Sequence, residues 1–290
     1  MIIDIHTHVG DILRSAESKR EEKKKEIKRA LLQLSEYIGF RNIYLGRLNK
    51  LFTNRVSKEL KACSKDAYKL LESMQENNID MCGLVPVSPN VETGITMALA
   101  NTNKSLFSLA SINPSKSVDE NIEMFDNYFK NGCKGLKLHP AIQNINPESY
   151  KLFAIMNAYE KYNLPVLCHT GWLPIGNERY QEADSLHFLI KSFPDIKFIL
   201  AHMNLLNPDK AIDFAVKYKN VYLEPSWQPS GIIARAMKKI PNSAERILFG
   251  SDFPYSSQTT PLKNIEKAVN DKKARERMLS LNAMELFKLY

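Results

Sequence analysis

The chain has 290 residues, which suits one α/β barrel, and its 44% hydrophobic and 25% charged residues are typical of a soluble globular protein. No apolar stretch approaches the roughly 20 residues of a membrane helix, which excludes a membrane-spanning protein. The net charge is +8, but residues 11–61 hold 14 Lys or Arg against 7 Asp or Glu, so the remaining chain is nearly neutral. A charge confined in this way argues against a nucleic-acid partner.

The four cysteines show no CxxC pairing, which indicates a reducing compartment. A cleaved signal peptide would remove His6 and His8, which the first strand carries, so we expect a cytoplasmic protein.

Eight short runs rich in Ile, Leu, Val and Phe are expected to form strands, with helical patterns between them. Beyond the second run they start about 25 to 30 residues apart, which is room for one strand, one helix and two short loops. An open doubly wound sheet would normally show a Gly-rich phosphate loop after an early strand, and none is present. The pattern therefore predicts an α/β fold, a (β/α)₈ TIM barrel that forms a single domain over residues 1–290. The expected strands are 2–6, 79–87, 105–112, 135–139, 164–169, 197–202, 221–224 and 247–252.

Asn-Pro pairs mark several helix starts. Asn146 is expected to cap a helix over 147–162, and Asn207 to cap a helix over 208–218. The pair Asn113-Pro114 precedes a further helix, which should end near Gly132 because glycine suits a C-cap.

About 70 residues separate the first strand from the second, and the excess lies in the basic segment 11–61. A helix dense in Lys and Glu is expected over 15–37, and the part that follows contains Arg41 and Arg47. Because the segment leaves the carboxyl end of the first strand, we interpret it as an inserted lid or cap over the barrel mouth. The alternative, an insertion that forms an oligomer contact such as a homodimer interface, stays open.

Five of the six histidines stand at the ends of the expected strands. His6 and His8 share one face of the first strand, because side chains alternate with a period of two. The carboxyl ends of barrel strands meet at one rim, and neutral imidazoles gathered there bind a divalent ion such as zinc. The sequence therefore predicts a metal site at this rim, to which other strand ends add His139, His169, His202 and Asp252.

Six short motifs follow one another along nearly the whole chain. They are DIHTH at 4–8, GLKLHP at 135–140, CHTG at 168–171, LAH at 200–202, FGSDFP at 249–254 and NAMELF at 282–287. In this order they resemble the amidohydrolase superfamily, in particular its branch related to aminocarboxymuconate-semialdehyde decarboxylase. The motifs are specific for the family but not for a substrate.

The resemblance implies that His6, His8, His169 and Asp252 ligate one catalytic metal, usually zinc. It also implies that His202 stands beside the metal as acid, base or substrate polariser. An open position on such a centre takes a water molecule whose pKa falls toward about 7. Asp252, next to that water, is a candidate proton acceptor.

Lys137 and His139 share a face of the fourth strand, and two roles stay open for them. In binuclear members of the superfamily a lysine on this strand is carbamylated and bridges two metals, and His202 would then ligate the second metal. The Lys-Leu-His-Pro form also occurs in this branch without a second metal. Lys137, His139 and His202 are therefore candidates for a second metal or for substrate binding.

Substrate recognition is weakly encoded. One arginine among Arg41, Arg47, Arg55 and Arg179 could clamp the carboxylate of an anionic substrate in fork geometry. Trp172 and Trp227 follow strand ends, where they either meet the substrate or pack at the end of the barrel.

We expect a hydrolase in which metal-activated water attacks an ester, lactone or amide of a small, anionic molecule. A nonoxidative decarboxylase or hydratase of a small acidic substrate is the alternative, because the same metal shell serves both. A metal-dependent deoxyribonuclease of the related barrel type would favour a glutamate where the chain has Lys137. A barrel that only binds a ligand would be expected to lack some of the metal ligands.

Overall fold

A computed structural model describes residues 1–13 and 55–290 of the chain. The predicted helix over 15–37, Arg41 and Arg47 lie outside the described residues, and so does the predicted lid over 11–61 except for its two ends, 11–13 and 55–61. Within the described ranges, no helix is both long enough and apolar enough to cross a membrane.

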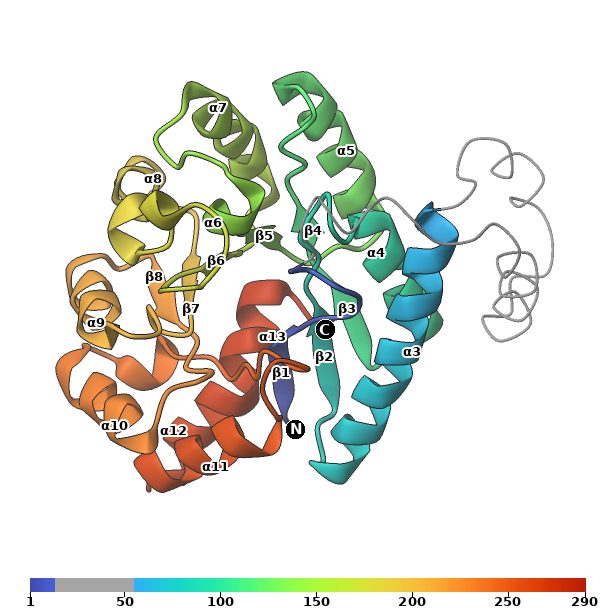
Figure 1. Ribbon diagram of the computed structural model, residues 1–290. Coiled ribbons are helices and arrows are strands. Elements are labelled where there is room, and N and C mark those ends of the chain that lie inside the picture. The colour runs from blue at the N-terminus through green and yellow to red at the C-terminus, as the bar shows by residue number, and fades with distance from the viewer. Residues whose placement is uncertain (14–54) are drawn as a thin grey trace.

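Strands and helices alternate along the described chain, and the helices surround the strands (Figure 1). The strands are β1 (Ile3–Thr7), β2 (Met81–Leu84), β3 (Leu106–Ser108), β4 (Ala110–Ser111), β5 (Leu136–Leu138), β6 (Val166–His169), β7 (Phe198–Ala201) and β8 (Val221–Leu223). The helices are α3 (Arg55–Glu76), α4 (Thr93–Thr102), α5 (Val118–Lys130), α6 (Pro140–Gln143), α7 (Tyr150–Tyr159), α8 (His187–Ser192), α9 (Pro208–Lys217), α10 (Ser230–Lys239), α11 (Thr259–Ala268), α12 (Lys272–Glu276) and α13 (Asn282–Phe287). Short 3₁₀ or π turns add η2 (Glu160–Tyr162), η3 (Glu178–Tyr180), η4 (Ala183–Leu186), η5 (Ser243–Glu245) and η6 (Arg277–Leu281).

All the strand pairs are parallel, in the orders β1-β2-β3 and β4-β5-β6-β7-β8. The predicted strand 105–112 contains both β3 and β4, separated by Leu109. The chain changes partner here, because Leu109 N donates to Leu84 O (3.0 Å) and Ala110 N donates to Gly135 O (2.8 Å). The two sheets are therefore continuous along one chain segment.

The segment 247–253 connects the other edges of the two sheets. On one side Leu248 N donates to Leu223 O of β8 (3.0 Å), and on the other Ile5 N of β1 donates to Phe249 O (3.1 Å). Parallel segments thus follow one another around a ring. The prediction of a regular strand over 247–252 is wrong, because the amide of Phe249 donates to Met278 O of η6 (2.9 Å) and not to a neighbouring strand.

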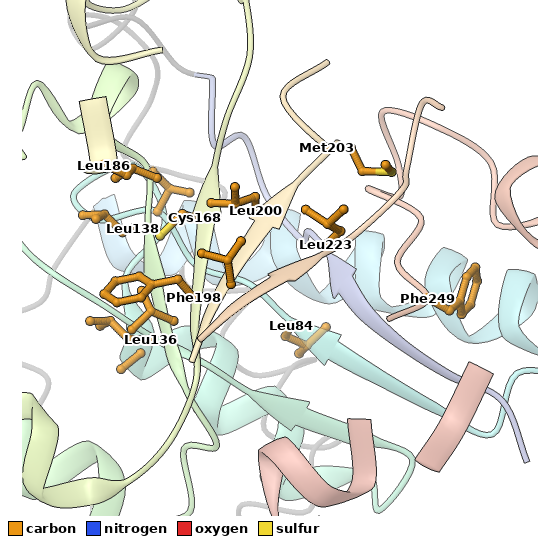
Figure 2. Packing of buried hydrophobic residues seen from close by; sticks show 14 of the residues in the cluster. Leu84, Leu136, Leu138, Cys168, Leu186, Phe198, Leu200, Met203, Leu223 and Phe249 are labelled. Atoms are coloured by element: carbon orange, nitrogen blue, oxygen red, sulfur yellow. The ribbon is translucent and has the colours of Figure 1, made fainter. Parts of the chain in front are cut away.

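Strand side chains alternate between two buried clusters. Leu136 and Leu138 pack outward against the helices, in the cluster shown in Figure 2. Lys137, between them, is level with Leu167, which belongs to the inner cluster together with Phe287 of α13. Phe287 lies against Gly135, just before β5. The amino-terminal end of the ring is thereby filled with apolar side chains, and its carboxyl end is left for a site.

An irregularity in β1 sets the direction of its histidines. Asp4 and Thr7 pair with residues of β2 that are only two positions apart, so β1 carries one extra residue between them. Such a β-bulge re-aims the side chains that follow it. Ile5 belongs to the inner cluster, whereas His6 and His8 both face the pocket at the carboxyl end of the ring. Strict alternation after Ile5 would have turned His6 away from that pocket.

Two of the three predicted helix boundaries are confirmed. α9 begins at Pro208, and Gly132 has a positive φ of 98° just beyond the end of α5. α7 instead begins at Tyr150 with Ser149 as its N-cap. Asn146 accepts the amide of Glu148 (3.0 Å) in a turn before the helix, which is why its predicted role as the cap is wrong.

A left-handed turn follows β7. Four consecutive residues have a positive φ: His202 (58°), Met203 (46°), Asn204 (61°) and Leu205 (26°). Residues other than glycine pay about 1 to 2 kcal/mol each for this conformation, so the surrounding structure must hold it. Gln228 does so, because its side-chain amide donates to the carbonyls of His202 (2.7 Å) and Leu205 (2.8 Å).

Gly171 packs directly against this turn. It has a φ of +103°, and a Cβ there would lie 2.6 Å from the backbone nitrogen of Leu205. Gly171→Ala is therefore expected to lower the free energy of unfolding by about 2 to 4 kcal/mol in urea denaturation. Gly231 of α10 is the matched control, because a Cβ there meets nothing within 4 Å, and Gly231→Ala should raise stability by about 0.5 to 1 kcal/mol. Equal stability of the two variants would contradict the close packing at Gly171.

Candidate metal centre

A pocket of about 300 Å³ opens at the carboxyl ends of the strands. The five histidines predicted at strand ends all line it, together with Lys137 and Asp252. The structure therefore brings these side chains into one place. The full lining is His6, His8, Ile12, Leu13, Lys137, His139, His169, Trp172, Leu173, Pro174, His202, Leu205, Trp227, Asp252 and Tyr255.

His6, His8 and Asp252 form a compact group of potential metal ligands. The Nε2 atoms of His6 and His8 lie 3.1 Å apart, and Asp252 Oδ1 lies 3.5 Å from the first and 3.2 Å from the second. Ligand atoms about 2.0 to 2.1 Å from a tetrahedral ion lie about 3.3 Å from one another. The spacing of these three atoms therefore fits a single divalent ion.

The hydrogen bond made by Nδ1 of each histidine determines whether Nε2 is free to bind a metal ion. His8 Nδ1 lies 2.7 Å from Val85 O, which only accepts, so Nδ1 carries the proton and Nε2 keeps its lone pair. His6 Nδ1 lies 2.8 Å from Glu224 Oε2. A carboxylate that accepts this proton leaves His6 Nε2 as a ligand too, the arrangement by which proteins commonly orient metal-bound histidines.

Glu224, which follows β8, is a further candidate site residue that the sequence pattern did not indicate. It is fully buried, and with His6 and His202 it forms a second group of potential ligands within the described residues. Burial raises the pKa of Glu224 to about 8, against the opposing effect of hydrogen bonds from Ser226. The signal that could have found it is the one shared by the other site residues, a position at the end of a strand.

Replacing the Glu224 carboxylate tests its role in orienting His6. Glu224→Gln keeps the shape of the side chain but replaces one accepting oxygen with an amide NH₂ group, which cannot accept the His6 proton, so metal affinity is expected to fall about 10- to 100-fold, as for other partners of metal-bound histidines. A titration against a chromophoric chelator measures this affinity. Glu285→Gln, which alters an exposed pair with Arg277, is the control. An unchanged affinity in Glu224→Gln would show that His6 is oriented without it.

His169 lines the pocket but joins neither group of ligand atoms among the described residues. Its ring stacks on that of His139, with centroids 4.0 Å apart and planes 7° apart. Its Nε2 lies 3.2 Å from Gly171 O, so this nitrogen carries a proton and Nδ1 is the one left to ligate. Burial lowers the pKa of His169 well below its usual value, and His202 and Lys137 add to this effect.

His202 lies beside the ligand group. Its ring centroid is 5.1 Å from that of His6, and its Nδ1 lies 2.6 Å from Ser226 Oγ. Burial lowers the pKa of His202 to about 4, although Asp252 opposes this shift. A neutral imidazole at this position can accept a proton.

Lys137 and His139 line the same pocket. Lys137 Nζ is 3.1 Å from His6 Nε2, and burial lowers the pKa of this lysine to about 8 while Asp252 opposes the shift. His139 caps α6, where its Nδ1 accepts the amide of Ile142 (3.4 Å). Because Nδ1 is an acceptor, the proton of the neutral ring is on Nε2, which disfavours His139 as a metal ligand.

Asp252 directs its two oxygens at different partners. Oδ1 faces His6 and His8, whereas Oδ2 accepts the indole N–H of Trp227 (2.8 Å). Burial acts to raise the pKa of Asp252, but His202, His8 and Trp227 outweigh it and hold the pKa well below the usual value. The carboxylate is therefore ionised in the form that a metal ion requires.

Comparison with protein families decides the identification. The sequence profile of a family described as amidohydrolase matches residues 97–289. The chain belongs to this family. The predicted resemblance to the amidohydrolase superfamily, and with it the prediction of an enzyme, is confirmed at the level of the family. Among curated proteins, no sequence matches this amidohydrolase significantly.

Solved structures similar to this amidohydrolase confirm the TIM-barrel fold. An uncharacterised TIM-barrel protein from Bordetella bronchiseptica is 18% identical and has a TM-score of 0.69, with 99% of this chain and 98% of that chain covered. A dihydroxybenzoic acid decarboxylase from Polaromonas sp. JS666, with bound manganese and 2-nitroresorcinol, is 15% identical, with a TM-score of 0.65 and coverage of 99% and 97%. A probable 2-pyrone-4,6-dicarboxylic acid hydrolase from Acinetobacter baumannii, with bound citric acid, is 15% identical, with a TM-score of 0.61 and coverage of 99% for both chains.

The walls of the amidohydrolase pocket are largely apolar. Trp172, Trp227 and Tyr255 contribute aromatic rings, and Ile12, Leu13, Leu173, Pro174 and Leu205 contribute aliphatic surface. Arg179 does not line the pocket. Its amide is bonded to Asn177 Oδ1 (3.1 Å) in η3, where the arginine is exposed to solvent. Among the residues whose side chains the structure describes, no arginine lines this pocket, and the side chain of Arg55 lies outside that set.

Proposed function

We propose that this amidohydrolase hydrolyses an ester, lactone or amide of a small anionic molecule, with one divalent ion held by His6 Nε2, His8 Nε2 and Asp252 Oδ1. His169 Nδ1 is the proposed fourth ligand. The ring proton of His169 is on Nε2, where it is donated to Gly171 O, so Nδ1 keeps its lone pair. The observation that carries the proposal is the compact group of His6, His8 and Asp252 with neutral His202 beside it. Two imidazoles and a carboxylate suit zinc, whereas the bound manganese of the Polaromonas decarboxylase makes manganese the alternative.

His202 is the proposed acid–base group. A divalent ion bound at this site would activate water and polarise a carbonyl oxygen. His202 Nε2 accepts the proton of the attacking water and then returns it to the leaving group. Asp252 is less suited to this proton transfer, because Oδ2 already accepts the Trp227 indole and Oδ1 faces the two histidines.

A single ion is proposed in preference to two. The predicted second site would use Lys137, His139 and His202. His139 has its proton on Nε2, because Nδ1 accepts a backbone amide, so a second ion would have one nitrogen fewer. Lys137, which lines the pocket, is then assigned to donate a hydrogen bond to an anionic group of the substrate.

The apolar and aromatic pocket wall favours one further candidate, decarboxylation of a small aromatic acid. The Polaromonas enzyme is a decarboxylase of dihydroxybenzoic acid, and aromatic side chains such as Trp172 and Trp227 pack well against a planar ring. In this reaction His202 would first take up a proton from solvent at Nε2 and then deliver it to the ring carbon as CO₂ leaves.

Metal analysis followed by a substrate panel tests both reactions. The purified enzyme is expected to hold about one equivalent of zinc or manganese. It is then incubated with lactones, amides, carboxylated dienes and hydroxybenzoates, and the masses of the products are measured by mass spectrometry. A lactone product heavier by one water, or two fragments of an amide whose masses add up to the substrate plus one water, supports the hydrolase. A product lighter by CO₂ supports the decarboxylase, and an enzyme that turns over without metal would contradict the proposal.

A further inference from the structure

Ser226 lies between the acid–base histidine and a buried carboxylate. Its Oγ is 2.6 Å from His202 Nδ1 and 2.9 Å from Glu224 Oε2. Ser226 and Glu224 are fully buried, and His202 is nearly so, so these contacts are shielded from water. Buried hydrogen bonds of this length fix the orientation of their partners.

The direction of each hydrogen bond follows from the partners of Glu224. The backbone amide of Ser226 donates to Oε1, and His6 Nδ1 and the backbone amide of His202 donate to Oε2, so both oxygens of Glu224 act as acceptors. The hydroxyl proton of Ser226 therefore points to Glu224, and the hydroxyl oxygen accepts a proton from His202 Nδ1. The proton of the neutral His202 ring is then on Nδ1, and Nε2 keeps its lone pair for the pocket.

The backbone of His202 is held independently of Ser226. Gln228 binds the carbonyl of His202 at 2.7 Å, and Met203 N donates to Glu224 O at 3.1 Å. Loss of the Ser226 hydroxyl would therefore leave the left-handed turn in place. Only the imidazole ring would become free to exchange its proton between the two nitrogens.

We propose that Ser226 is a positioning residue that keeps the proton of His202 on Nδ1, so that the unprotonated Nε2 faces the substrate. This inference rests on the proposed function in that it takes His202 as the acid–base group. Ser226 itself touches neither the ligand group nor the reacting atoms. It acts through His202, much as a carboxylate or carbonyl sets the tautomer of a catalytic histidine elsewhere.

Nitrogen NMR of the metal-free protein, labelled with ¹⁵N-histidine, tests the tautomer without any substrate. His202 is expected to show a protonated Nδ1 and an unprotonated Nε2 in the wild type, with the resonances assigned from His202→Ala. Ser226→Ala should shift them toward the other tautomer or toward a mixture, and Ser226→Thr, which keeps a hydroxyl, should restore the wild-type pattern. A proton on Nε2 in the wild type, or an unchanged pattern in Ser226→Ala, would overturn the inference.

Kinetics and metal content complete the test. Ser226→Ala is expected to lower kcat about 10- to 100-fold with little change in KM and with full metal content, because the contact of Glu224 with His6 remains. Ser226→Thr should recover most of the lost turnover. Unchanged kcat in a correctly folded Ser226→Ala variant would overturn the inference. Full turnover in His202→Ala would instead overturn the proposed role of His202 in the reaction. The NMR result on the position of the His202 proton does not depend on that role.

Discussion

The double variant His6→Ala/His8→Ala is expected to lose both the bound ion and the activity. In the unmodified protein the Nε2 atoms of His6 and His8 lie 3.1 Å apart and face Asp252 Oδ1. Their removal leaves only one carboxylate oxygen of the compact group. Turnover should fall by at least about a thousandfold, equivalent to about 4 kcal/mol of transition-state stabilisation. Metal content by mass spectrometry and the rate on the substrate found in the panel measure the two effects.

His187→Ala is the control for that experiment. His187 begins α8 on the outside of the ring and contacts Tyr218, so its loss should change neither metal content nor turnover. Full metal occupancy in the double variant would mean that the ion is bound elsewhere, and the assignment of His6 and His8 would be wrong.

His202→Ala is expected to separate metal binding from chemistry. Because His202 is assigned to proton transfer and not to the ion, the variant should keep its metal while turnover falls about a hundredfold or more. Stability in urea should change little beyond the loss of the Ser226 contact, since Gln228 still holds the turn. Loss of metal from this variant would instead make His202 a ligand and favour the arrangement with two ions.

The ring of parallel strands could be predicted because its signal is local. Short apolar runs at regular spacing, separated by helical patterns, identify an α/β barrel without knowledge of any contact. The segment 247–253 shows the limit, since its sequence is as apolar as a strand. The amide of Phe249 donates to η6, a contact between distant parts of the chain that no local pattern records.

The convergence of the strand-end histidines was also predictable, but their individual geometry was not. The bulge in β1 that aims His6 at the pocket depends on pairing with β2. His169 stacks on His139 and lies apart from the compact ligand group, which depends on the path of the loop at Gly171. Glu224 was missed because a buried carboxylate at a strand end resembles an ordinary loop residue until its partner His6 is known.

Residues 224–228 show the same limit most clearly. Along this short loop Glu224 contacts His6, Ser226 contacts His202, Trp227 contacts Asp252 and Gln228 holds the turn after β7. The sequence indicates only an aromatic residue near the rim. These contacts reach the ends of β1 and β7 and Asp252, so they become visible only in the folded chain.

Anomalous diffraction from crystals grown with zinc or manganese would test the metal centre most directly. The structure predicts one anomalous peak in the pocket, about 2.0 to 2.2 Å from His6 Nε2, His8 Nε2 and Asp252 Oδ1. A peak out of reach of these three atoms, or a pair of peaks on either side of Lys137, would contradict the single-ion centre proposed for this enzyme.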